Sequence, residues 1–201
     1  SCSLWNMNLA LATAYEVRKR FPDALIMAGG PSIAKDPDLV EPFFQGHPYV
    51  DIIVTGEGEE AFVSALKYHD ERKSFSDIPG IVFRERETGR VRYGLPEEIL
   101  NMPDLPSPFL DGTFDEFYQK YHNKFSGIIW ETNRGCPFTC TFCTWGNYKS
   151  RKIRYNSLEQ IAQEVEWIGK NQVRYVAMTD ANFGIHQRDV EIAKMLAQCK
   201  K

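Results

Sequence analysis

Three cysteines lie within eight residues of the chain, in the spacing C-x3-C-x2-C formed by Cys136, Cys140 and Cys143. Thiolates this close together repel one another unless a metal ion or a cluster takes up their charge, and such sets select zinc or iron–sulfur clusters. Zinc usually takes four ligands, and no second cysteine pair accompanies this triplet. A four-iron cluster on three cysteines keeps one iron open to a cofactor. The spacing therefore favours an iron–sulfur cluster.

Two other interpretations of the triplet stay open. A zinc site would need a fourth ligand, for which His122 is a candidate. A disulfide would leave one of the three thiols unpaired, and nothing else in the sequence indicates secretion. The isolated Cys2 and Cys199 are more typical of packed residues than of ligands.

The cysteines follow a segment that is typical of a β-strand. Residues 127–132 are mostly apolar and β-prone, and Gly135 and Pro137 then end regular structure and open a loop. The three thiols are therefore expected on one loop at the carboxyl end of a strand. Proteins with α/β folds collect their chemistry at this end.

With Phe142 as the aromatic residue of C-x3-C-x-aromatic-C, this loop resembles the radical S-adenosylmethionine (SAM) enzymes. The flanking residues Arg134–Pro137 and Thr144–Gly146 resemble those found in one branch of this family, whose members carry an N-terminal cobalamin-binding domain. The resemblance implies a [4Fe-4S] cluster on the three cysteines, whose open iron binds the amino and carboxylate groups of SAM. It also implies reductive cleavage of SAM to methionine and a 5′-deoxyadenosyl radical, chemistry that the cofactor carries.

A second loop is expected to contact SAM. The strand predicted at residues 173–178 ends in Thr179-Asp180-Ala181-Asn182, where many members of the family have Gly-Gly-Glu. The resemblance implies that Asp180 binds the ammonium group of SAM, with Asn182 as second candidate, and that Phe142 stacks near the adenine. The alternative is that Asp180 or Asn182 only caps the loop. No residue is assigned a catalytic role.

The second half of the chain alternates strands and helices. A capping box of Ser157 and Gln160 begins a helix with an apolar stripe through residue 168, and another helix is expected at 187–198. The order strand, cysteine loop, helix, strand, polar loop, helix corresponds to two βα units of a parallel barrel. Residues 126–201 are thus expected to form the first βα units of a radical SAM partial TIM barrel.

The first half predicts half of a doubly wound, Rossmann-like α/β domain of the cobalamin-binding type. Apolar strands at 24–28 and 50–54 alternate with helices at 4–20 and 61–68 and with a weaker helix at 38–44 that Pro42 interrupts. On the first helix, Leu4 and Leu11 are predicted to share a buried face. Residues 81–85 and 90–93 predict a β-hairpin at the sheet edge.

Glycines follow both apolar strands, where a ligand can approach the backbone without meeting a Cβ atom. With the serine-bearing start of the chain, this order resembles cobalamin-binding domains. The resemblance implies cobalamin contacts from Ser3, Gly29, Gly30, Pro31, Gly56, Glu57 and Gly58. The family's Asp-x-His-x-x-Gly motif, which supplies the lower cobalt ligand in some members, is not in the sequence. The alternative is a scaffold that binds no cofactor.

Four prolines between Pro96 and Pro108 predict a semi-rigid linker over residues 96–125, after a first domain at 1–95. Neither predicted domain is complete by the family's pattern, and the first residue is Ser1. We therefore expect the sequence to be a segment of a longer protein.

The composition excludes several classes of partner. The 201 residues carry a net charge of −3 with scattered basic residues, which gives no nucleic-acid footprint. No apolar run approaches the roughly 18 residues of a membrane span, and no signal peptide is visible. Clustered cysteines favour a reducing, cytoplasmic location.

The resemblance implies a radical SAM enzyme that is cobalamin-dependent and transfers a methyl group, with ring closures and rearrangements as alternative reactions. It would act on a small-molecule or peptide substrate and take electrons from a reducing donor. One alternative is a radical SAM enzyme with a scaffold as its first domain. The other is a zinc-stabilised binding module without catalysis.

Overall fold

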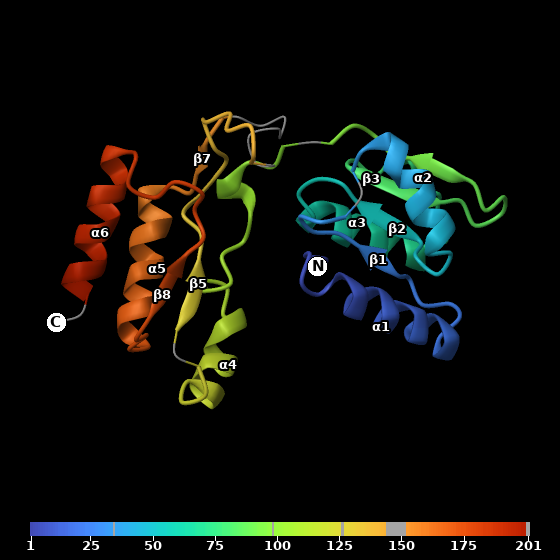
Figure 1. Cartoon of the computed structure of the whole chain (residues 1–201). Coiled ribbons are helices and arrows are strands. Elements are labelled where there is room, and N and C mark those ends of the chain that lie inside the picture. The colour runs from blue at the N-terminus through green and yellow to red at the C-terminus, as the bar shows by residue number, and fades with distance from the viewer. Residues whose placement is uncertain (34, 98, 126, 144–151, 200–201) are drawn as a thin grey trace. The chain divides into compact units, whose positions relative to one another are not determined.

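The computed structural model describes residues 1–33, 35–97, 99–125, 127–143 and 152–199. It divides the chain into two compact units, Ser1–Ile99 and Leu100–Lys201 (Figure 1). Both units combine helices with strands, so the predicted α/β class is confirmed. Within these described ranges, no helix has both the length and the apolar character needed to cross a membrane.

The first unit is built on one four-stranded sheet in the order β1-β2-β3-β4. Strand β1 (Met27–Ala28) runs parallel to β2 (Ile52–Val54), and β3 (Ile81–Arg84) pairs antiparallel with β2. Strand β4 (Val91–Tyr93) then pairs antiparallel with β3, which confirms the predicted hairpin. Of the two hairpin strands only β4 lies at an edge of the sheet, because β3 pairs with both β2 and β4.

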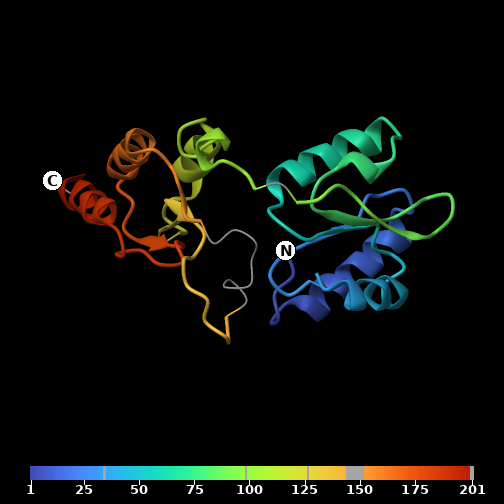
Figure 2. The same ribbon diagram turned by 90° about the horizontal axis from the view of Figure 1, so that it is seen from above.

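Helices cover both faces of this sheet, as Figure 2 shows. Helices α1 (Met7–Arg20) and α2 (Pro37–Gly46) lie on one face and α3 (Glu59–Asp70) lies on the other. Strand residues alternate between the two cores with the period of two that a strand imposes. Ile53 packs in the core with α1 and α2, whereas its neighbour Ile52 packs in the core with α3.

Two expectations for these helices are corrected. Leu4 is 85% exposed because α1 begins only at Met7, so Leu4 is not part of the buried face that contains Leu11. Helix α2 continues through Pro42, which was expected to interrupt it. Its fully buried residues Val40 and Phe44 anchor it to the core, and this packing outweighs the hydrogen bond that proline cannot donate.

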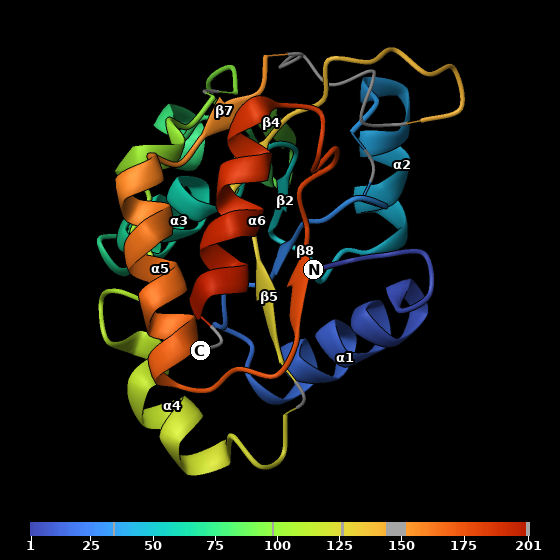
Figure 3. The same ribbon diagram turned by 90° about the vertical axis from the view of Figure 1, so that its left-hand side faces the viewer.

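The second unit contains a parallel strand pair, β5 (Ile128–Trp130) and β8 (Val176–Met178). Helices α5 (Leu158–Lys170) and α6 (Gln187–Cys199) lie side by side along the same face of this pair (Figure 3). Their apolar stripes form one core with the strands, which includes Trp130, Ile161, Val165, Ile168 and Ile192. As predicted, the hydroxyl of Ser157 caps α5 by accepting a hydrogen bond from the Gln160 backbone N–H.

Residues 100–125, predicted as part of the linker, lie in the second unit and include a 3-10 turn (Met102–Asp104) and helix α4 (Thr113–Tyr121). Phe109 and Tyr118 are buried and pack their rings against Trp167, at centroid distances of 5.2 and 5.4 Å. The indole N–H of Trp167 donates to Asp115 Oδ1 at 2.7 Å. Prolines mark this stretch in the sequence, but its aromatic residues determine where it packs.

Candidate functional site

The cysteine loop begins where β5 ends. After β5 the chain continues into β6 (Asn133–Arg134), which pairs antiparallel with β7 (Arg154–Tyr155). Gly135 follows directly, with a φ of +109°, and a Cβ atom there would lie 2.7 Å from the backbone oxygen of Lys152. The two arms of the loop are therefore held together at its base, one residue before Cys136.

All three cysteines of the loop are free thiols, which rules out a disulfide among them in this structure. Cys136 and Cys143 are half-buried and Cys140 is exposed. The backbone N–H of Cys143 donates to the carbonyl of Cys140 at 3.1 Å, so a turn joins these two. Among the described residues, no three side chains of the types that bind metal lie close enough together to hold an ion. The structure thus places the thiols on one loop without gathering them at one point.

Other residues predicted around the loop have distinct positions. Phe142 is 91% exposed, so its ring is accessible to a ligand. Thr144–Gly146, which carried part of the family resemblance, lie outside the described residues. His122 follows α4, before β5 begins, whereas the cysteines follow the opposite end of that strand (Figure 1). This placement disfavours His122 as a fourth zinc ligand.

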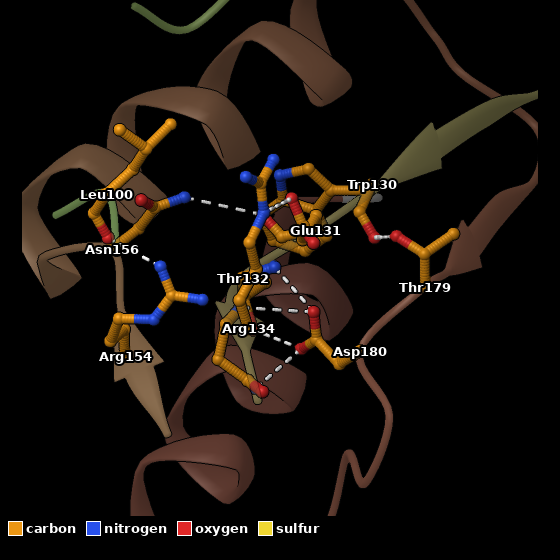
Figure 4. A network of polar contacts seen from close by, with 10 residues as sticks. Leu100, Trp130, Glu131, Thr132, Arg134, Arg154, Asn156, Thr179 and Asp180 are labelled. Atoms are coloured by element: carbon orange, nitrogen blue, oxygen red, sulfur yellow. Dashed lines mark hydrogen bonds and ion pairs between the residues drawn. The ribbon is translucent and has the colours of Figure 1, made fainter. Parts of the chain in front are cut away.

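Asp180, just after β8, contacts the segment that leads into the cysteine loop (Figure 4). Its Oδ1 atom accepts hydrogen bonds from the backbone N–H groups of Thr132 at 2.6 Å and Asn133 at 3.1 Å. Its Oδ2 atom accepts from the Thr132 hydroxyl and from Asn133 Nδ2, the latter at 2.9 Å. An ionised carboxylate offers about four acceptor positions, so these four donors fill it.

Asn182, two residues further along the same loop, reaches a predicted cluster ligand. Its Nδ2 atom lies 3.1 Å from Cys136 Sγ, within hydrogen-bonding distance of a sulfur acceptor. Cysteine binds metals as the thiolate, and this amide is positioned to donate a hydrogen bond to the sulfur. The structure therefore brings Asn182 to Cys136 and directs Asp180 to the backbone of the same segment.

Strand β7 is held from its other side by the start of α6. The Arg188 guanidinium lies 4.5 Å from the centroid of the Tyr155 ring and donates to the backbone oxygen of Asn156 at 2.8 Å. The His186 ring packs edge-on against the Tyr155 ring at 5.5 Å. Burial raises the pKa of the Tyr155 hydroxyl above its usual value. Both arms of the cysteine loop are thus fixed by residues that follow β8.

The β6–β7 pair was not predicted from sequence, because two-residue strands leave no periodic pattern. The contacts of Arg188 were not predicted either, because its partner Asn156 lies 32 residues away along the chain. One signal could have been found. Asp189, in the first turn of α6, accepts hydrogen bonds from the N–H groups of Gly184 and His186 at 2.9 and 3.1 Å. An acidic side chain in the first turn that accepts hydrogen bonds from the backbone N–H groups before the helix is a known N-terminal capping signal in sequences.

In the first unit, the loop after β1 packs against the start of the chain. The backbone N–H of Cys2 donates to the Gly29 carbonyl at 2.6 Å, and Ser3 is buried beside it. Gly30 has a φ of +113°, and a Cβ atom there would lie 2.7 Å from the Cys2 carbonyl oxygen. The structure thus places Cys2, the neighbour of Ser3 in the chain, against the two glycines, while Pro31 is exposed.

The loop after β2 includes Gly56, Glu57 and Gly58 and lies at the same sheet edge, because β1 and β2 are parallel neighbours. A Cβ atom on Gly56 would lie 2.1 Å from the Glu97 carboxylate, whereas Gly58 has only Val54 nearby, at 3.9 Å. Contacts within the chain therefore explain glycine at Gly30 and Gly56. The sequence analysis had attributed these glycines to the approach of a ligand.

Taken together, the second unit has parallel βα architecture with a cysteine loop at the carboxyl end of its first strand. This arrangement defines an α/β unit with a cysteine-containing loop at the edge where such proteins usually bind ligands. Residues 130–201, which include the loop and Asp180, match the radical SAM superfamily. This match lies within the second unit of the chain.

Relatives of known description align with the whole chain. It is 37% identical to the cobalamin-dependent radical SAM methyltransferase TokK of Streptomyces tokunonensis. It is equally identical to the 2-(S-pantetheinyl)-carbapenam-3-carboxylate methyltransferase of Streptantibioticus cattleyicolor. Each alignment covers 100% of this chain, and the chain spans 29% of the length of each relative.

Solved structures share the fold. The cobalamin-dependent S-adenosylmethionine radical enzyme OxsB, with aqua-cobalamin and SAM bound, superposes with a TM-score of 0.70 at 23% identity, over 96% of this chain and 27% of OxsB. The radical SAM methyltransferase TsrM of Kitasatospora setae, with cobalamin and a [4Fe-4S] cluster bound, gives 0.64 at 17% identity, over 94% of this chain and 35% of TsrM. At these identities the likeness concerns the fold alone.

Proposed function

We propose that this protein is a radical SAM enzyme that holds a [4Fe-4S] cluster through Cys136, Cys140 and Cys143. The observation that carries the proposal is the Asn182 amide directed at Cys136 Sγ, at the carboxyl end of β5 within the family-matched segment. The donor set fits the cluster, because three free thiols share one loop and one of them already receives a hydrogen bond. An open iron would remain for SAM.

When bound, the cluster would supply the electron for the reductive cleavage of SAM. The protein's own residues would bind and orient SAM. The exposed ring of Phe142 would pack against the adenine. Asn182 would accept from the SAM ammonium through its carbonyl oxygen while its amide donates to Cys136. Asp180 could contact that ammonium only by giving up one of its four present hydrogen bonds.

We further propose that the first unit is the second half of a Rossmann-like cobalamin-binding domain, and that the second unit begins a partial TIM barrel. The methyltransferase relatives support cobalamin-dependent methyl transfer as the reaction. Cobalamin would lie against the carboxyl ends of β1 and β2, bordered by Ser3, Gly29, Gly30, Pro31, Gly56, Glu57 and Gly58.

A second candidate is a radical SAM enzyme whose first unit binds no cofactor. The observation that favours it is the packing of Cys2 on Gly30 and of Glu97 on Gly56. Contacts within the chain account for both glycines without any ligand. In either case we propose a reducing electron donor and a small-molecule or peptide substrate, in the cytoplasm.

The cluster is tested by analysis of iron and acid-labile sulfide in anaerobically purified protein. We expect about four of each per chain, lost in Cys136→Ala and kept in the matched control Cys199→Ala, which removes a thiol on α6. The reduced protein should release 5′-deoxyadenosine from SAM. One zinc and no labile sulfide would instead support the zinc-stabilised module.

Cobalamin binding is tested separately, by the visible spectrum after reconstitution with hydroxocobalamin and removal of excess. Gly58→Val places a side chain at the proposed rim where the structure leaves room for it, and should weaken binding at least tenfold. Gly46→Val is the matched control, since nothing lies within 4 Å of a Cβ atom there. Wild-type protein that retains no cobalamin would favour the second candidate.

A further inference from the structure

We propose that Asn182 is a positioning residue for the cluster, which holds the Cys136 sulfur by a hydrogen bond and raises the cluster's reduction potential. The inference rests on the proposed function, because it requires a cluster on the cysteine loop. It assigns Asn182 a role that exists before SAM binds.

The geometry of the contact supports this role. Asn182 Nδ2 lies 3.1 Å from Cys136 Sγ, and both side chains are half-buried, so water screens the contact only in part. Reduction adds negative charge that the cysteine sulfurs share. A donor directed at one sulfur stabilises the reduced cluster more than the oxidised one, and so raises its potential.

The amide is also held in place. Asp180 fixes the start of the same loop through four hydrogen bonds to Thr132 and Asn133, both of which are buried. Asn133 precedes Cys136 by three residues. The hydrogen bonds of Asp180 therefore hold the segment that carries Asn182 against the segment that carries Cys136. The amide is already in place before the cluster binds, so binding does not have to order it.

The contact distinguishes Cys136 from the other two predicted ligands. Within the described part of the chain, a side-chain donor reaches Cys136 Sγ, whereas none is recorded for Cys140 or Cys143. A change at Asn182 should thus alter the electronic properties of the cluster through one sulfur, without removing a ligand.

The test measures the reduction potential of the reconstituted cluster by dye-mediated titration followed by electron paramagnetic resonance, without SAM. Asn182→Leu keeps the approximate volume and removes the donor. We expect about a tenfold lower ratio of reduced to oxidised cluster at a fixed potential, which is about 59 mV for a one-electron couple. Asn182→Asp should lower the potential further, because it places a carboxylate near the sulfur. Asn182→Gln, which keeps an amide, should recover part of the shift.

Asn171→Leu is the matched control. It also removes an amide that donates a hydrogen bond, to the Trp167 carbonyl at 2.9 Å, but at the far end of α5, and the potential should not change. Asn182→Ala is a second test variant. It also removes the donor but adds no apolar volume, so it covers the case in which the leucine disturbs packing.

A wild-type potential in both Asn182→Leu and Asn182→Ala would overturn the inference while leaving the cluster in place. Weaker SAM binding with an unchanged potential would also overturn it, and would assign Asn182 to SAM alone. A wild-type protein that takes up no cluster would overturn the proposed function, and this inference with it.

Discussion

The two units use the carboxyl ends of their parallel strands in different ways. In the second unit, side chains of the loop after β8 reach across to the neighbouring segment, where Asp180 and Asn182 contact Thr132, Asn133 and Cys136. In the first unit, the loops after β1 and β2 are packed by the chain itself, through Cys2 and Glu97. The same topological position thus supports hydrogen bonds between side chains and the neighbouring segment in one unit, and close packing against glycines in the other.

This difference predicts which substitutions each unit tolerates. A loop packed against glycine should be sensitive to a Cβ atom added at the glycine that makes the contact, whereas loops joined by side chains should be sensitive to the loss of a donor or acceptor.

The largest loss of stability is expected for Gly30→Ala. The new Cβ atom would lie 2.7 Å from the Cys2 carbonyl oxygen on a residue with positive φ, which should cost about 4 kcal/mol. Gly58→Ala, at the neighbouring loop with open space, should change stability by less than about 0.5 kcal/mol. Urea unfolding of both variants checks the pair. Equal stabilities would show that backbone packing does not limit the loop after β1.

Asp180→Ala is expected to have the next largest effect. It removes four hydrogen bonds and leaves the buried donors of Thr132 and Asn133 without acceptors, at a cost of about 2–3 kcal/mol. Asp104→Ala is the control, because its carboxylate accepts an exposed hydrogen bond from Asn101. Hydrogen exchange at the Thr132 and Asn133 amides should accelerate in the first variant only. Unchanged exchange would refute the role of Asp180 as an anchor.

The ion pair between Arg18 and Asp51 in the first unit should contribute less to the free energy of unfolding. Arg18 binds Asp51 at 2.5 Å and the Ala24 carbonyl at 2.9 Å, but both charged side chains are partly exposed. Solvent screening reduces the value of such a pair, so Arg18→Ala should cost about 1 kcal/mol. Lys19→Ala, which removes an exposed partner of Glu16 on the same helix, is the control. A loss as large as that of Asp180→Ala would contradict the contrast between the units.

The smallest effect on stability is expected at the predicted SAM contact. Phe142 is 91% exposed, so Phe142→Ala should change the free energy of unfolding by less than about 0.5 kcal/mol. SAM affinity should nevertheless fall, because the ring would no longer cover the adenine. Calorimetric titration of reconstituted protein with SAM checks this, and an unchanged affinity would remove Phe142 from the proposed site.

Long apolar patterns allowed much of the fold to be predicted. The strands around Ile52 and Val176 and the helices α5 and α6 follow directly from periodicity. Periodicity could not show that Leu4 lies outside α1, because residues 4–6 form a turn ahead of the helix that the apolar pattern does not reveal. Nor could the prolines near Pro106 reveal that the following aromatic residues pack into the second unit.

The site was predictable to a more limited extent. The close spacing of Cys136, Cys140 and Cys143 is enough to predict a set of metal ligands. The family resemblance added Asp180 and Asn182 as predicted SAM contacts. Their actual partners lie 46 to 48 residues away along the chain, and no local pattern encodes such contacts. Glycines were recognised as necessary, but sequence could not distinguish room for a ligand from contact with Cys2 or Glu97.

The most direct test of the account is electron paramagnetic resonance of the anaerobically reconstituted, reduced protein before and after SAM is added. The account predicts the signal of a reduced four-iron cluster that changes when SAM binds the open iron, and that is absent in Cys136→Ala. A protein without a cluster signal, or a signal that SAM leaves unchanged, would contradict it.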